Sequence, residues 1–325
     1  MTIGRRALLG ACATAALART ARAAPVVRLG VLRFGTVSWE LDVIRRHHLD
    51  AEAGVTIEAV ELAGSQATQV AMQAGSVDLT AQDWLWVARQ RAAGADWTFS
   101  PFSNVAGAVV APAASPVRSI ADLKGRRLGI AGSPIDKSWL ILRAYAQRTL
   151  GLDLDQAVEK RFAPPPLLAQ EVASGRLDAV LTFWPFAARA EAAGMRQVLS
   201  VEDAVRGLGI QGTVPVVGYV FADSWAARQR PALDGFLAAA AKAQRILAEQ
   251  DAEWQALRPL TATQTDAELA QLMAYYRRGI PRGFGAPERD AAAALFTVLA
   301  ETGGEALVGK ARTLPAGTFW QAGPS

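Results

Sequence analysis

The chain has 325 residues, of which 51% are hydrophobic and 20% are charged. This composition excludes a disordered protein and provides for roughly two domains. The formal net charge of +4 rests on four arginines within the first 23 residues, Arg5, Arg6, Arg19 and Arg22. Without that segment the 34 basic residues become 30, which balances the 30 acidic ones, so nucleic-acid binding has no electrostatic support.

Residues 1–23 have the order of a secretory signal peptide. Arg5-Arg6 comes first, an apolar run too short to span a bilayer follows, and small residues precede a cleavage site after Ala23. The arginine pair resembles a twin-arginine export signal, which predicts a periplasmic protein. A minor alternative is that the stretch ending at Cys12 is a lipoprotein box, which would anchor the protein at that cysteine.

Few residues are available for metal or thiol chemistry. Cys12 is the only cysteine, and cleavage after Ala23 removes it together with any disulfide or cysteine nucleophile. The two histidines, His47 and His48, are adjacent, so on a helix they point about 100° apart and do not chelate as an i, i+4 pair would. We therefore expect no metal and no cofactor.

The mature chain opens with alternating strand and helix patterns. Strands are predicted at residues 26–32, 55–62, 77–81 and 97–103, and helices at 38–49, 65–75 and 84–94. An extended segment at 104–112 follows, and then Ser119 and Asp122 form the S-x-x-D capping box of a short helix. This alternation predicts α/β layers with a mostly parallel sheet.

The alternation then resumes. Strands are predicted at 126–132, 158–162 and 177–183, and helices at 134–151, 167–175 and 185–194. A second extended segment at 213–222 leads into a tail of helices only, at 231–250, 266–279 and 287–304. Two extended segments indicate two crossings between lobes. We expect one lobe of residues 24–108 and 216–325, completed by the helical tail, and a second lobe of residues 109–215.

One short pattern occurs twice. The stretches "GSVDLTAQDW" (75–84) and "GRLDAVLTFW" (175–184) share a glycine, an aspartate three residues later and a tryptophan six residues after that. Each follows a predicted helix and contains a predicted strand. The repeat indicates one supersecondary unit used once in each lobe.

Two longer stretches carry a family resemblance. "VAGAVVAPAASPVRSIADLKGRRLGIAGSP" (105–134) and "EVASGRLDAVLTFWPFAARAEAAG" (171–194) resemble the periplasmic solute-binding proteins of ABC importers. The most similar subgroup comprises nitrate, sulfonate and taurine binders and thiamine-precursor-like binders. The resemblance implies a type 2 periplasmic-binding fold with two lobes and two crossing segments. It also implies a monomeric, non-catalytic protein that passes a small molecule to a permease.

Other functions stay open beside this one. A periplasmic sensor or assembly partner would share the same plan. Thiamine-pyrimidine synthases also share the fold, but they use a histidine and a cysteine-rich segment, and the mature chain has no cysteine. A transcription regulator would need a helix-turn-helix where this chain has its signal.

Ligands of α/β sheets gather beyond the carboxyl ends of strands. After the first strand the candidate ligand residues are Gly35, Thr36, Ser38 and Trp39, and after the second strand the candidate is Ser65. The alternative is an ordinary helix cap at Ser38 with Trp39 packed locally. The next two residues of that helix that carry charge, Glu40 and Asp42, are expected to be solvated.

Trp84 and Trp184 follow later strands and are predicted to form opposite walls of one cleft, and the alternative is that both are core tryptophans that anchor their helices. Asp83 either accepts a bond from a ligand amine or caps the next helix. Further candidates are Ser133, Asp136 and Lys137, at a predicted helix start that begins with Pro134. Exposed N–H groups and Lys137 favour an anion there, whereas Asp136 argues against one. The ligand therefore remains an anion, an amine-bearing heterocycle or a zwitterion.

Overall fold

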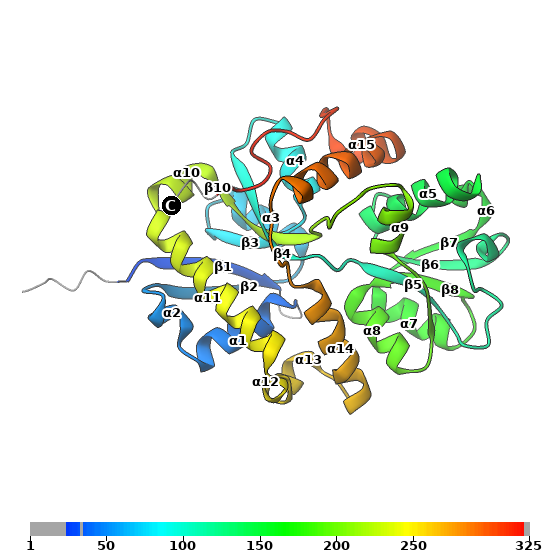
Figure 1. The fold of residues 1–325 in the computed structure, drawn as a ribbon, viewed down its shortest axis with the longest axis horizontal. Helices are drawn as coiled ribbons and strands as arrows, with labels where there is room; N and C mark the ends of the chain where they lie inside the picture. The colour runs from blue at the N-terminus through cyan, green and yellow to red at the C-terminus, as the bar shows by residue number, and fades with distance from the viewer. Residues whose placement is uncertain (1–23, 33–34, 322–325) are drawn as a thin grey trace, which may run out of the picture.

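The computed structural model describes residues 24–32 and 35–321, so the predicted signal peptide lies outside the described residues. The chain forms two five-stranded sheets in two α/β lobes that lie side by side (Figure 1). This is the two-lobed α/β class that the sequence predicts.

The two sheets are built alike. In spatial order the first contains β2 (Thr56–Leu62), β1 (Val26–Leu32), β3 (Leu79–Gln82), β10 (Val217–Ala222) and β4 (Trp97–Ser103). The second contains β7 (Glu159–Ala163), β6 (Arg127–Ala131), β8 (Ala179–Phe183), β5 (Gly107–Ala111) and β9 (Arg196–Ser200). Each has three parallel strands beside one antiparallel strand, β10 or β5, which enters along a crossing from the other lobe. Both sheets are therefore mixed.

The predicted helices are present, and further short helices that the sequence did not predict lie between them. In the first lobe they are α1 (Val37–Arg46), α2 (Leu49–Glu52), α3 (Ser65–Gln73) and α4 (Trp84–Ala92). In the second they are the 3-10 helix η1 (Ile120–Leu123), α5 (Lys137–Leu150), α6 (Leu154–Ala157), α7 (Pro165–Ala173), α8 (Trp184–Ala192) and α9 (Val201–Gly207). The tail contains α10 (Asp223–Arg228), α11 (Arg230–Glu249), α12 (Asp251–Ala256), α13 (Arg258–Thr261), α14 (Asp266–Gly279) and α15 (Ala286–Val308). The Ser119–Asp122 capping box is present at η1.

The helical tail contacts both lobes. Helix α11 packs on α1 of the first lobe, whereas α14 packs on α8 of the second and α15 packs on both α4 and α5 (Figure 1). Helix α15 has the length and apolarity of a membrane span, but its buried side chains face the core of both lobes and Gly304 interrupts it at φ 59°. It is therefore a core helix that ties the lobes together.

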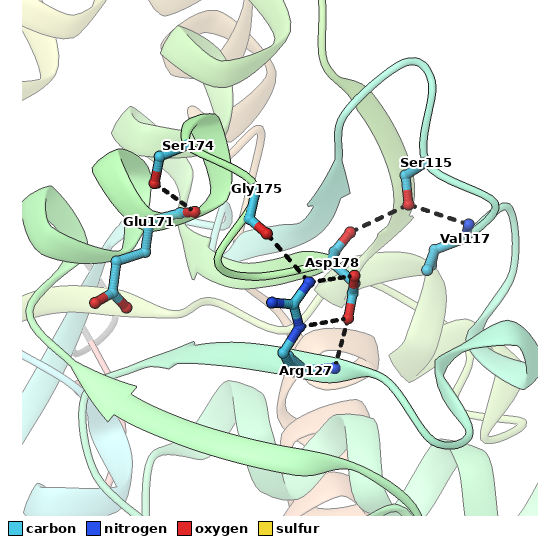
Figure 2. Close-up of polar contacts among 7 residues, drawn as sticks. All are labelled: Ser115, Val117, Arg127, Glu171, Ser174, Gly175 and Asp178. Carbon is cyan, nitrogen blue, oxygen red and sulfur yellow. Dashed lines mark hydrogen bonds and ion pairs between the residues drawn. The ribbon is translucent and has the colours of Figure 1, made fainter.

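The repeated pattern forms an equivalent ion pair in each lobe. Asp178, just before β8, accepts hydrogen bonds from the backbone N, Nε and Nη2 of Arg127 on β6, at 2.8, 3.1 and 2.9 Å (Figure 2). Asp78 accepts the same three bonds from Arg28 on β1. The preceding glycines have φ of 66° and 72°, the left-handed conformation that ends a helix. The aspartates thus fix the amino ends of the strands, at the sheet edge opposite the helix-start loops.

We predict that Asp178→Ala lowers the free energy of unfolding by about 1–2 kcal/mol, because three charge-assisted hydrogen bonds are lost at a half-buried site. Asp78→Ala is expected to have a similar effect, and the double variant the sum, since the sites lie in different lobes. Urea denaturation measures all three. The exposed Arg230–Asp234 pair supplies a control, as Asp234→Ala removes only a surface contact. Strong non-additivity would contradict independent roles in the two lobes.

Candidate ligand-binding site

A cavity of about 560 Å³ lies between the lobes, where the carboxyl ends of β1, β3 and β8 meet the helix starts beyond them. Both crossing segments contribute to its lining through Val105, Ala106, Val216 and Val217. Its position is the one where α/β sheets bind ligands.

Seven of the eleven predicted ligand residues line this cavity, namely Gly35, Thr36, Asp83, Ser133, Asp136, Lys137 and Trp184. Three are not part of its lining, namely Ser38, Trp39 and Trp84. Ser65 begins α3, and its side chain lies outside the described part of the chain.

The loop after β1 is held by its own serine. Ser38 Oγ donates to the carbonyl of Gly35 at 2.5 Å, and Thr36, not Ser38, is the N-cap residue of α1. Ser38 is therefore neither a helix cap nor a lining residue in this structure. It fixes the turn that presents Gly35 and Thr36 to the cavity.

Trp84 needs a correction, because it does not face Trp184 across the cleft. Its side chain is fully buried against Phe296 and Phe319, and its Nε1 donates to the carbonyl of Pro215 at 2.7 Å. The indole thereby anchors α4 to α15 and to the second crossing segment. In this structure Trp84 is a core tryptophan.

Trp184 remains at the cavity, inside an aromatic cluster that joins the lobes. Its backbone N–H donates to the carbonyl of Ala106 at 3.0 Å, which fixes the start of α8 on a crossing segment. Its ring stacks on Tyr275 of α14 at 6.2 Å and meets the edge of Trp39 at 5.8 Å. Trp39 is thus buried behind Trp184 and contacts the other lobe, so it supports the cavity wall without forming it.

Phe183 is an aromatic lining residue that the sequence analysis missed. It is the last residue of β8, lines the cavity and keeps 37% of its surface exposed, in contrast to 8% for Trp184. It therefore offers more ring surface to a ligand than Trp184 does. The sequence signal was its place at the end of a strand directly before Trp184-Pro185.

Two helices begin at the cavity with an aspartate cap. Asp83 Oδ1 accepts from the backbone N of Trp86 at 2.9 Å, and Asp136 Oδ1 accepts from Ser138 N at 2.9 Å and Trp139 N at 3.3 Å. The predicted helix start at Pro134 is therefore wrong: α5 begins at Lys137, because the Asp136 carboxylate takes the first free N–H groups. Burial raises the pKa of Asp136, although the charge of Lys137 and the hydrogen bonds from Trp139 N and Ser138 N oppose the shift.

Glu40 also needs a correction, because it is 1% exposed and not solvated. Its carboxylate accepts hydrogen bonds from Tyr219 Oη at 2.8 Å and from Tyr276 Oη. Burial raises the pKa of Glu40 to about 7, although these hydrogen bonds oppose the shift. The apolar spacing of Val37, Leu41 and Ile44 was the missed signal, since position 40 shares their helix face.

A larger cavity of about 840 Å³ adjoins the same crossing segments and is lined by charged residues of α9, α14 and the loop after α14. Of the predicted ligand residues only Trp84 and Lys137 line it. Within this lining Glu202 accepts a hydrogen bond from Ala106 N at 2.7 Å, which holds the crossing segment in place.

No group of three or more His, Cys, Asp or Glu side chains within residues 24–32 and 35–321 is placed to hold a metal ion. His47 instead pairs with Glu253 at 3.0 Å.

Residues 51–253 match the model of the family described as NMT1/THI5 like. The chain belongs to the NMT1/THI5-like family. Its resemblance to the solute-binding proteins of ABC importers is thereby confirmed. No curated protein matches this NMT1/THI5-like chain significantly in sequence.

Solved structures share the type 2 fold. The periplasmic aliphatic sulphonate-binding protein SsuA from Escherichia coli superposes with a TM-score of 0.72 at 19% identity, covering 91% of this chain and 92% of its own. The alkanesulfonate-binding SsuA from Xanthomonas axonopodis pv. citri, bound to MOPS, gives 0.67 at 21% identity and coverages of 91% and 98%. The desulfurization enzyme DszB gives 0.61 at 16% identity and coverages of 90% and 97%. The fold alone therefore carries both binding proteins and an enzyme.

Proposed function

We propose that this NMT1/THI5-like protein is an extracytoplasmic solute-binding protein that captures a small molecule between its lobes and delivers it to the permease of an ABC importer. The main support for this proposal is the cavity of about 560 Å³. It has the size of a small-molecule site and is lined by residues of both lobes and both crossing segments. Family membership supports the same role. The protein acts as a monomer, with lobes of residues 24–108 plus 216–325 and 109–215.

A non-catalytic role is favoured by the lining of the cavity. Neither histidine of the chain contributes to the cavity, and the single cysteine belongs to the predicted signal peptide. A thiamine-pyrimidine-synthase-like activity would need those groups. The second candidate is a periplasmic sensor or assembly partner, which would use the same cavity without a permease.

Thermal-shift screening of the mature protein tests the proposal. The protein is freed of ligand by unfolding and refolding, then mixed with nitrate, alkyl and aryl sulfonates, taurine, aminopyrimidines and polyamines. A ligand at about 100 times its dissociation constant adds roughly 2.7 kcal/mol to stability, which is readily visible. A shift that disappears in Trp184→Ala and Ser133→Ala supports the cavity as the site. A shift that survives both changes places binding elsewhere. If the protein co-purifies with partner proteins that do not include a permease, the sensor is favoured.

The proposed export route makes a separate prediction. Replacing both Arg5 and Arg6 with lysine is expected to leave the full-length precursor in the cytoplasm, because the twin-arginine route requires the pair. Cell fractionation and immunoblotting measure this. Cys12→Ala is the control and should leave export and processing unchanged. Normal processing of the double lysine variant would indicate another route, and retention of the Cys12→Ala precursor would indicate a lipoprotein.

A further inference from the structure

Two carboxylates from different lobes face the same cavity. Asp83 follows β3 of the first sheet and Asp136 follows β6 of the second, and both line the space between the lobes. The charge of Asp83 raises the pKa of Asp136, although the charge of Lys137 lowers that pKa by more. Like charges in one cavity repel each other, and burial strengthens that repulsion.

Each carboxylate has one oxygen engaged and one left for a ligand. The Oδ1 atoms of Asp83 and Asp136 accept the backbone N–H groups of α4 and α5. Within residues 24–32 and 35–321 no hydrogen bond of either carboxylate involves Oδ2. The positive ends of both helices are thus already occupied by the protein's own anions, which removes the usual reason for an anionic ligand to bind there.

The two described cations of the cavity are partly engaged by the protein itself. Lys137 Nζ donates to the carbonyl of Val216 at 3.1 Å, so part of its donor capacity is used by the crossing segment. Arg89 lies more than one turn further along α4, where its side chain passes Gly309. Among the described residues 24–32 and 35–321, the charged side chains of the lining are Arg89, Lys137, Asp83 and Asp136, so their formal charges balance. A group with N–H donors, by contrast, fits the two Oδ2 atoms directly.

We propose that the ligand carries an N–H-bearing group, neutral or positively charged, which is held between Asp83 of one lobe and Asp136 of the other. This inference rests on the proposed function. The group relieves the repulsion between the carboxylates and links the lobes, so its binding favours the closed arrangement. The apolar remainder of the ligand lies along Phe183, Trp184 and Ile135, which line the same cavity. Sulfonates and nitrate are disfavoured.

Three probes with one ring and different head groups test the inference. Refolded mature protein is titrated with benzamidine (cationic N–H donors), benzamide (neutral N–H donors) and benzenesulfonate (an anion without donors), by calorimetry at millimolar concentrations. We expect benzamidine to bind most tightly, benzamide to bind next and benzenesulfonate not to bind. Tighter binding of benzenesulfonate than of benzamidine would overturn the inference.

Asparagine variants identify the carboxylates responsible. Asp83→Asn and Asp136→Asn each keep an oxygen for the helix cap but replace the second oxygen with an NH₂ donor. Each is expected to weaken benzamidine binding about tenfold, as loss of a charge-assisted hydrogen bond does, and to improve benzenesulfonate binding. Asp50→Asn at α2, which does not line the cavity, is the control. Melting curves show that each variant folds, and unchanged benzamidine binding in both would overturn the inference.

The same series separates this inference from the proposed function. If no probe binds and mass spectrometry finds a small molecule without N–H donors in the protein as purified, the solute-binding role stands and the N–H-bearing class is wrong. If no probe binds and no molecule is bound, both are contradicted.

Discussion

Replacing Trp84 with alanine is expected to lower the free energy of unfolding by about 3–5 kcal/mol, the usual cost of deleting a large buried ring. The ring is fully buried between Phe296 and Phe319, so its removal leaves a cavity between α4 and α15. The variant also loses the hydrogen bond to the Pro215 carbonyl, which leaves a buried acceptor without its partner. Urea or thermal denaturation of the ligand-free protein measures the loss.

Trp225→Ala is the matched control for Trp84→Ala. That tryptophan is half-buried on α10 and touches Phe221 near the carboxyl end of β10, so its loss is expected to cost clearly less. A Trp84→Ala protein of nearly unchanged stability but without ligand binding would contradict the core position of Trp84. It would restore the interpretation of two opposing tryptophan walls.

The second large effect concerns pH. A carboxyl group whose pKa is higher in the folded state than in the unfolded chain stabilises the fold below its unfolded pKa, and this contribution is lost as the pH rises through the folded value. Burial raises the pKa of Glu40 from 4.5 to about 7, so its contribution falls across that interval. The difference corresponds to about 3 kcal/mol, since one pKa unit is about 1.4 kcal/mol.

Glu40→Gln removes the titrating group and so tests whether Glu40 causes this dependence of stability on pH. The wild type is expected to lose about 2–3 kcal/mol relative to Glu40→Gln between about pH 5 and pH 8, measured by urea denaturation across the range. Subtracting the two curves cancels the contributions of other groups, including Asp136 and Glu202, whose pKa values burial also raises. Asp42→Asn on the same helix is the control, because it removes a carboxylate that pairs with Arg46 at the surface and does not touch the buried Glu40 cluster. Parallel profiles for wild type and Glu40→Gln would contradict a buried, titrating Glu40.

Much of the fold could be predicted because its signals are local. Apolar periodicity located the strands and helices, and the two extended segments at 104–112 and 213–222 predicted two crossings, which β5 and β10 provide. The repeat "GxxD" predicted one unit per lobe, and each unit contains the same Arg–Asp pair. What the repeat did not reveal is that its aspartates pair with arginines at the amino ends of the strands, because an ion pair fifty residues apart leaves no local pattern.

The site was harder to predict because burial is decided by distant segments. Trp84 and Trp184 have equivalent places in the repeat, but α15 covers the first and leaves the second at the cavity. Likewise Trp39 and Glu40 are covered by Tyr276 of α14, a helix that follows more than two hundred residues later. Asp136 was expected within a helix that begins at Pro134, yet it caps a later start, since one carboxylate satisfies two N–H groups there. These outcomes depend on tertiary contacts that periodicity does not record.

Native mass spectrometry of the mature protein, purified from the periplasm without unfolding, tests the central claim most directly. The predicted result is a complex of one protein chain with one small molecule, which is lost on unfolding and rebinds to the refolded wild type. Phe183→Ala and Trp184→Ala should retain the molecule poorly, while Trp225→Ala retains it. A protein that carries no small molecule, or one whose molecule is retained equally by all three variants, would contradict capture in the cavity between the lobes.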